Sequence, residues 1–329
     1  MSFFGRSISR EKNKNYVREA HHAGSWYEDD GVGLSNTLNR FLLEASSSSS
    51  SSPSSSDDDS TARAARGIVS PHAGFSYSGP TAAYAYLALR EMLVTKKHEP
   101  ITILVLHPSH HVYLDGCAVS NASSIETPIC SLPVNDDLRN ELLASSPLFT
   151  VMNKQTDEEE HSGEMQYPFV AKTIIDAQHN NCTILPIMVG SISMKKEKEY
   201  GYHLAPIIHR PNIFTIVSTD FCHWGQRFGY MSHDDNVPIY ESIERMDRLG
   251  MDHIEMQKPG AFATYLKATA NTICGRHPLA VWLHAIYCNK ESNQETLAVK
   301  FVKYAQSSQV RSLRESSVSY ASAIARKIN

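Results

Sequence analysis

The sequence lacks the marks of a secreted, membrane-spanning or nucleic-acid-binding protein. Its 329 residues carry a formal net charge of −4 at pH 7, so we expect no basic face and no nucleic-acid partner. No apolar run approaches the roughly 20 residues that a membrane span needs. The first residues, 1–14, also lack the apolar core of a signal peptide. We therefore predict a soluble cytoplasmic protein, with the nucleus as a second location.

Paired cysteines are missing too. The six cysteines are scattered with no CxxC motif, which in a chain of this length indicates reduced thiols and argues against a structural zinc ribbon. There is no internal repeat. The histidine count, in contrast, is high: sixteen residues, several of them in tight local clusters.

One segment is of low complexity. Residues 46–59 are a serine run that ends in three aspartates and offers nothing apolar to bury. We predict a disordered insertion at about 45–62, placed in a surface loop between a helix at 34–43 and a strand at 66–69. Residues 1–15 are expected to be a flexible tail, and residues 16–329 a single domain.

Short β-rich runs alternate with helical patterns along the rest of the chain. The first four runs are almost continuously apolar, as in strands covered on both faces. The alternation predicts an α/β fold, with a mixed, largely parallel central sheet flanked by helices. Pro80, Pro259 and Pro278 are expected in first turns of helices. The predicted strands are 67–70, 101–106, 183–189, 213–218 and 297–304, and the predicted helices are 80–94, 136–145, 163–177, 197–208, 237–256, 259–270 and 277–287.

Three predicted strands end in similar chemistry. His72 follows the strand at 67–70, His110 follows the strand at 101–106, and Asp220 and His223 follow the strand at 213–218. In open α/β sheets, ligands bind outside the carboxyl ends of the strands. If the three strands are parallel, these four side chains reach one rim of the sheet.

Two imidazoles and one anionic ligand, with an open position, suit a divalent transition metal. Cys274 is our candidate for the third ligand, because it precedes a predicted helix whose N-terminus favours the thiolate form. Asp220 is the competing anionic ligand. A set of two histidines and one cysteine favours iron, copper or zinc over magnesium or calcium.

Each of these residues also has a plain structural interpretation. A single histidine after a strand is more often a loop or capping residue, and most free cysteines are buried in a core. His223 could simply pack beside Trp224, and His107 and His111 are expected to support the site or the fold.

Two further segments have the same ambiguity. For His161 and Glu164 we favour an acidic loop and helix start capped by Ser162 over a place at the pocket rim. For Trp26 and Tyr27 we favour the core over closure of the rim.

Several motifs, taken in order, give the chain a resemblance to a known family. The sequence is similar to the Memo family, named for mediator of ErbB2-driven cell motility, over about residues 16–325. The motifs are HAGSWY at 22–27, PHAG at 71–74, PSHH at 108–111, the segment 157–162, STDFCHWG at 218–225, the segment 271–278, YAQSS at 304–308 and SSVSYA at 316–321.

The resemblance implies a fold and a site. Memo proteins share the fold of class III extradiol dioxygenases, which use a non-haem Fe(II). The family's metal ligands fall on His72, His110 and Cys274. Asp220 and His223 match pocket positions beside the metal, and His223 falls where the dioxygenases carry a catalytic histidine. The resemblance implies one copper or iron ion per chain and copper-dependent redox activity. It also implies a role in cell motility signalling through the cytoskeleton.

The functional prediction follows with two alternatives. We predict a redox protein that acts on small oxygen species, with His223 as acid and base and Asp220 beside the metal. One alternative is a non-enzymatic adaptor or metal chaperone that binds a phosphotyrosine-type signalling peptide or a receptor complex. The other is a dioxygenase of aromatic diols, which Cys274 argues against because the dioxygenases have a carboxylate there. His107 replaces a glycine usual in the family, so an added imidazole could narrow the pocket or add a ligand.

Overall fold

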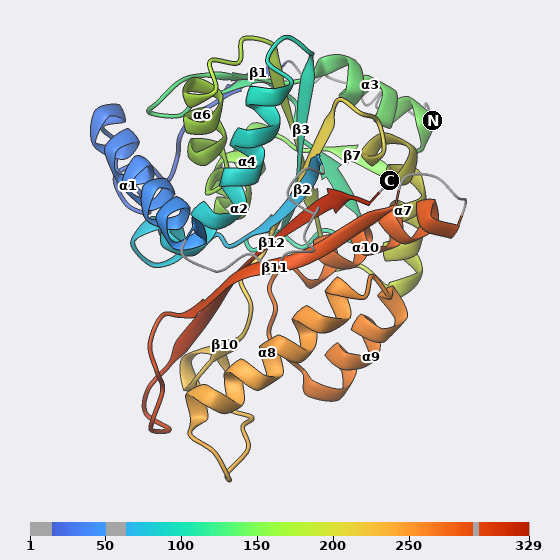
Figure 1. Cartoon of the computed structure of the whole chain (residues 1–329). Coiled ribbons are helices and arrows are strands. Elements are labelled where there is room, and N and C mark those ends of the chain that lie inside the picture. The colour runs from blue at the N-terminus through green and yellow to red at the C-terminus, as the bar shows by residue number, and fades with distance from the viewer. Residues whose placement is uncertain (1–14, 51–63, 292–295, 329) are drawn as a thin grey trace, which may run out of the picture.

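A nine-stranded mixed sheet lies at the centre of the computed structural model, which describes residues 15–50, 64–291 and 296–328 (Figure 1). The strand order is β10-β12-β2-β9-β3-β8-β4-β7, and β11 pairs with β12. The strands are β2 (Ala65–Ser70), β3 (Ile101–Pro108), β4 (Cys117–Val119), β7 (Phe149–Val151), β8 (Cys182–Val189), β9 (Ile213–Ser218), β10 (His223–Trp224), β11 (Leu297–Gln306) and β12 (Ser317–Lys327).

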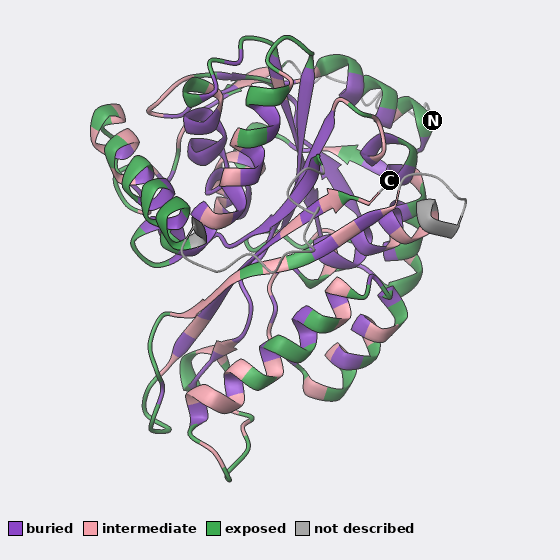
Figure 2. Ribbon diagram, viewed as in Figure 1, coloured by how far each residue is buried: buried purple, intermediate pink, exposed green. Residues whose placement is uncertain are grey.

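The parallel part of the sheet is its centre. Strands β2, β9, β3 and β8 are parallel neighbours, whereas β12 joins β2 and β4 joins β8 in antiparallel pairs. Every residue of β2, β3 and β9 is buried, because helices cover both faces. The predicted mixed α/β fold is therefore confirmed. Figure 2 shows this buried centre between more exposed helices.

Helices form a layer on each side of the sheet (Figure 1). Helix α2 (Phe75–Thr95) packs on β2 and β12 and contacts α1 (Gly31–Ser50) and α6 (Tyr167–Asp176). On the other side, α10 (Arg276–Glu291) packs on β3 and β9 beside α7 (Met194–Ile208). Helix α8 (Ile239–Glu255) contacts β11 and α9 (Pro259–Thr269). The remaining helices are α3 (Asp136–Ser145), α4 (Lys154–Glu159), α5 (His161–Glu164) and the short 3₁₀ helix η2 (Gln226–Phe228).

Helix α2 begins earlier than predicted. Pro80 was expected in the first turn but lies inside the helix, which starts at Phe75. Proline leaves one carbonyl four residues earlier without its helical partner, here that of Ser76. Because Ser76 is exposed, water can satisfy this carbonyl. Pro259 and Pro278 do lie in the first turns of α9 and α10.

The serine run starts as a helix. Helix α1 continues to Ser50, so the predicted disordered insertion at about 45–62 is wrong for residues 45–50. The hydroxyls of Ser47 and Ser48 donate to the carbonyls of Leu43 and Glu44, both at 2.9 Å, and so add side-chain bonds within the last turns. Residues 51–63 and the predicted tail at 1–14 lie outside the described residues. A single domain over 16–329 stays a prediction.

Several strands have no clear signal in the sequence and were not predicted. Strand β12 is rich in serine and alanine, which gives no strong apolar pattern, yet most of it is buried between β11 and β2. A separate three-stranded sheet consists of β1 (Tyr16–Arg18), β5 (Ala122–Ile125) and β6 (Leu132–Pro133). In the part of the chain that the structure describes, no helix is long and apolar enough to span a membrane.

Candidate metal centre

The three predicted strand ends meet at one cavity. Strands β2 and β3 both pair with β9 in parallel, so the loops that follow them leave the same edge of the sheet. The cavity has a volume of about 580 Å³. All five predicted site residues contribute to its wall: His72, His110, Asp220, His223 and Cys274.

His72 follows β2 and is held on two sides. Its backbone N–H donates to Asp220 Oδ1 at 2.8 Å, and its Nδ1 lies 2.9 Å from Ser218 Oγ at the end of β9. Ser218 is fixed in turn by Gln166, whose side-chain amide donates to it at 2.9 Å. The other ring nitrogen of His72, Nε2, therefore faces the cavity, 3.2 Å from Cys274 Sγ.

His110 follows β3 and is oriented by a buried carboxylate. Glu160 accepts from the backbone N–H of His110 at 2.5 Å and lies 2.8 Å from its Nδ1. Its Oε1 also accepts from the backbone N–H of Ser162 at 2.9 Å, which caps α5. Since Nδ1 is engaged, Nε2 of His110 is the nitrogen that remains available as a ligand.

Cys274 lies two residues before α10. Its Sγ accepts a hydrogen bond from the backbone N–H of Asp220 at 3.2 Å. That N–H and the N-terminus of α10 place positive partial charges beside the sulfur. Gly275 fits the turn because a side chain there would collide with Thr219, whose Oγ1 accepts the Gly275 N–H at 3.0 Å.

One ligand atom from each of His72, His110 and Cys274 lies within 4.8 Å of the others. This is the spacing that a single ion can bridge after small side-chain adjustments. A second set, made of His110, Glu160 and His161, meets the same limit. Among the described residues, no such set includes Asp220, which argues against it as the third ligand.

Asp220 and His223 flank the cluster. Asp220 is buried, and burial raises the pKa of its carboxyl although the charge of His223 opposes this. His223 Nδ1 lies 3.0 Å from the carbonyl oxygen of Phe221 and 3.2 Å from that of Thr272, so its N–H points to the backbone. Its Nε2 is thus the nitrogen available for proton transfer.

The pKa values of the cavity histidines shift in opposite directions. Burial, together with the neighbouring His110 and His161, holds the pKa of His72 well below its ordinary value. Burial also lowers the pKa of His161, to about 3. For His110, hydrogen bonds to Cys274 and Glu160 outweigh burial and raise the pKa to about 10. A neutral His72 is ready to bind a metal, whereas His110 must first release a proton.

The structure places two residues of the cavity wall differently from the sequence-based prediction. His161 was expected in a structural acidic loop, but it lines the cavity and stacks on His110 with ring centroids 4.5 Å apart. Trp26 was expected in the core, yet it lines the same cavity and stacks on His161 at 4.4 Å. Ser162 was expected to cap a helix, but Glu160 caps α5 instead. The signals in the sequence for Glu160 were its place directly before a histidine and its position within the family motif at 157–162.

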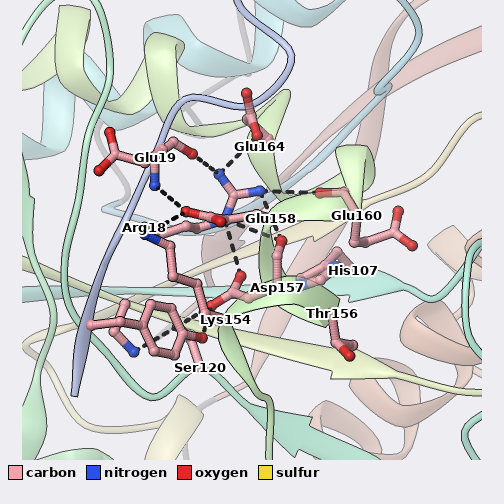
Figure 3. Close-up of polar contacts among 12 residues, drawn as sticks. Arg18, Glu19, His107, Ser120, Lys154, Thr156, Asp157, Glu158, Glu160 and Glu164 are labelled. Carbon is pink, nitrogen blue, oxygen red and sulfur yellow. Dashed lines mark hydrogen bonds and ion pairs between the residues drawn. The ribbon is translucent and has the colours of Figure 1, made fainter. Parts of the chain in front are cut away.

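Glu164 and Tyr27 belong to the supporting structure, as predicted. Figure 3 shows Arg18 reaching the segment that runs from Asp157 to Glu164. Arg18 pairs with Glu164 at 2.7 Å and Asp157 at 3.0 Å, and all three side chains are almost fully buried. Glu164 also accepts from the Tyr27 hydroxyl at 2.6 Å.

His107 and His111 do not reach the candidate ligand set. His107 is buried in β3, with Nδ1 3.1 Å from Ser162 Oγ, and is not part of the cavity wall. Its ring lies close to Gly163 of α5, because a Cβ added at Gly163 would lie 3.1 Å from it. His111 is exposed. Their expected supporting or structural role agrees with this placement.

The fold and the site together define an α/β protein that gathers two histidines and a cysteine at the carboxyl ends of parallel strands. The sequence profile described as Memo-like protein matches residues 18–324. The chain therefore belongs to the Memo family.

Relatives span almost the whole chain. The chain is 42% identical to Protein MEMO1 of Mus musculus over 310 residues, which covers 94% of this chain and 97% of that protein. It is 41% identical to Protein MEMO1 of Homo sapiens with the same coverage, and 40% identical to Protein memo-1 homolog of Caenorhabditis elegans, of which 82% is covered. A solved structure of uncharacterized protein JW3007 from Escherichia coli K12 matches with a TM-score of 0.43 and 15% identity, over 70% of this chain and 90% of that one.

Proposed function

We propose that the protein binds one copper or iron ion through His72 Nε2, His110 Nε2 and Cys274 Sγ. The observation that carries the proposal is the convergence of these donors within 4.8 Å. The surrounding residues fit it: Ser218 and Glu160 occupy the Nδ1 atoms of the two histidines, as carboxylates and hydroxyls do behind metal-binding histidines. A thiolate beside two imidazoles favours copper, iron or zinc.

A bound copper or iron ion would supply one-electron exchange with oxygen species. The chain itself would supply proton transfer and exclusion of water. His223 has its Nδ1 fixed by backbone carbonyls, so Nε2 can give or take a proton at the cavity. Asp220 acts as a positioning residue, because it accepts from the backbone of His72 while its own N–H donates to Cys274. Trp26 and His161 cover one side of the cavity.

Family membership extends the proposal to a biological role. The Memo name, as a mediator of ErbB2-driven cell motility, supports a part in motility signalling with a signalling peptide or receptor complex as partner. A cytoplasmic location belongs to the same proposal.

Metal analysis of protein purified without oxygen tests the site. We expect about one copper or iron ion per wild-type chain, because the two donor sets share His110, and loss of that ion in Cys274→Ala and His72→Ala. His111→Ala is the matched control, since His111 is exposed and outside the cluster. Circular dichroism would confirm that each variant is folded.

The variant His161→Ala separates the two donor sets. If the ion lies between His72, His110 and Cys274, this variant keeps it. Loss of metal from His161→Ala together with retention by Cys274→Ala would move the ion to the set with Glu160. A folded wild type that takes up neither Fe(II) nor Cu(I) would overturn the proposal.

A further inference from the structure

A second cavity lies beside the candidate metal centre. It has a volume of about 390 Å³ and is formed by residues of α7, α9 and the start of α10. Thr272, Arg276 and His277 belong to the walls of both cavities. A ligand at this shared edge would therefore touch both compartments.

Most of the wall of the second cavity is apolar. Ile192 and Phe262 are buried core residues that contribute to it, and Leu266 and Ala280 extend the apolar surface. A cavity of this size with such a wall is typical of a small-molecule site, in which apolar contacts give affinity and a few polar groups give orientation.

The charged groups of the wall favour an anion. Lys267 and Arg276 are exposed, and neither forms an ion pair within the part of the chain that the structure describes. The carboxylate of the wall, Glu197, is already paired with His277 at 2.7 Å. Arg276 is also the first residue of α10, so the positive end of that helix adds to its charge.

His277 supplies a second polar group at the shared edge. Its Nδ1 faces Glu197, whereas its Nε2 is buried and has no hydrogen-bond partner among the described residues. Because the Nδ1–H of His277 engages Glu197, the guanidinium of Arg276 is the group at the shared edge that can bind a carboxylate.

We infer that the second cavity binds the apolar body of a small amphipathic carboxylate, with the carboxylate held at the shared edge by Arg276. Binding at this site requires no metal ion, so the inference is separate from the proposed metal centre. Its role as the substrate compartment of that centre rests on the proposed function, because the carboxylate would then lie at the mouth of the metal cavity.

Calorimetric titration of the metal-free protein with sodium octanoate tests the inference. Octanoate combines an apolar chain with a carboxylate, and 1-octanol serves as the uncharged comparison. We expect saturable binding of octanoate, about tenfold tighter than binding of 1-octanol. Equal affinities, or no saturable binding of octanoate, would overturn the inference.

Two variants locate the ligand. Ala263→Trp fills the cavity from α9, so we expect it to weaken octanoate binding at least about tenfold. Ala268→Trp, exposed on the same helix and outside the wall, should bind like the wild type. Arg276→Gln, at an exposed position that does not threaten folding, should abolish the preference for octanoate over 1-octanol. Identical behaviour of Ala263→Trp and Ala268→Trp would contradict this location.

Repeating the titration beside metal analysis separates this inference from the proposed function. Octanoate binding to a protein that takes up no metal would support the cavity and overturn the metal centre alone. Metal uptake without octanoate binding would leave the metal centre supported and overturn the cavity inference.

Discussion

Glu160 is the residue whose placement most affects the candidate centre. It is almost fully buried, and its two oxygens meet two N–H groups of the backbone and Nδ1 of His110. Burial alone would raise the pKa of this carboxyl, but the hydrogen bond and charge of His110 outweigh it and hold the pKa far below the ordinary range. A fixed negative charge behind His110 keeps that ring oriented and makes it a stronger ligand.

We expect Glu160→Gln to weaken metal binding by about 10- to 100-fold, as is typical when the partner behind a metal-binding histidine is lost. The amide keeps the shape of the side chain but lacks the charge. Competition with a chelator of known affinity would measure the change. Glu159→Gln is the control, because the Glu159 side chain accepts a hydrogen bond from Gln155 and is outside the cavity. Unchanged affinity in Glu160→Gln would show that His110 needs no orientation by Glu160.

At the scale of elements, Arg18 attaches β1 to the segment that carries Glu160. Its guanidinium pairs with Asp157 and Glu164 and donates to the carbonyl of Glu160 at 3.2 Å (Figure 3). Burial raises the pKa of Glu164, but the hydrogen bond from His22 and the charge of Arg18 outweigh it and lower the pKa to about 2. The position of the segment that carries Glu160 therefore depends on β1, which lies more than a hundred residues earlier in the sequence.

We expect Arg18→Met to lower the free energy of unfolding by about 3–5 kcal/mol, because it leaves two buried carboxylates without their cation. Urea denaturation would measure the loss. Arg245→Met is a matched control: the pair of Arg245 with Glu241 is exposed and 3.9 Å long, so its loss should cost less than about 1 kcal/mol. If the two variants were equally stable, the buried cluster would not hold β1 in place.

At the scale of the whole molecule, Asp247 links three distant segments. It lies fully buried in α8 and accepts from Asn271 at 2.8 Å, from the Tyr304 hydroxyl of β11 at 2.9 Å, and from the backbone N–H of Cys222 at 3.3 Å. Burial outweighs these hydrogen bonds and raises the pKa of its carboxyl from 3.8 to about 6.

This shift predicts a pH dependence of stability. Between about pH 4 and 6 the folded protein holds the Asp247 proton more tightly than the unfolded chain does. The free energy of unfolding contributed by this group therefore falls by about 3 kcal/mol as the pH rises through that window, and is flat above it. Urea denaturation of wild type and Asp247→Asn from pH 4 to pH 7 would measure it as the difference between the two curves.

The control for this pH dependence is Asp252→Asn, exposed on the same helix, whose difference curve should stay flat. A flat difference curve for Asp247→Asn as well would mean that the Asp247 carboxyl titrates alike in the folded and unfolded states.

Much of the architecture was predictable because its signals are local. The apolar runs of β2, β3, β8 and β9 each mark a strand buried on both faces, and the structure confirms all four. The antiparallel strand β12 was missed because serine and alanine can pack in a sheet without an alternating apolar pattern. Helix α1 extends into the serine run, where Ser47 and Ser48 bond to carbonyls of the preceding turn, a feature that composition does not reveal.

By itself, the sequence determined which residues follow the central strands, and hence that His72, His110 and Asp220 could meet at one edge of a parallel sheet. The order of the motifs along the chain likewise indicated membership of the Memo family. Only the tertiary structure shows that Cys274 forms a close donor set with the two histidines, whereas no such set among the described residues includes Asp220. It also shows that His161 and Trp26 line the cavity and that Glu160 orients His110. The reason is physical: the positions of strands in the sequence follow from the local apolar pattern, whereas distances between side chains depend on how loops far apart in the chain pack against one another.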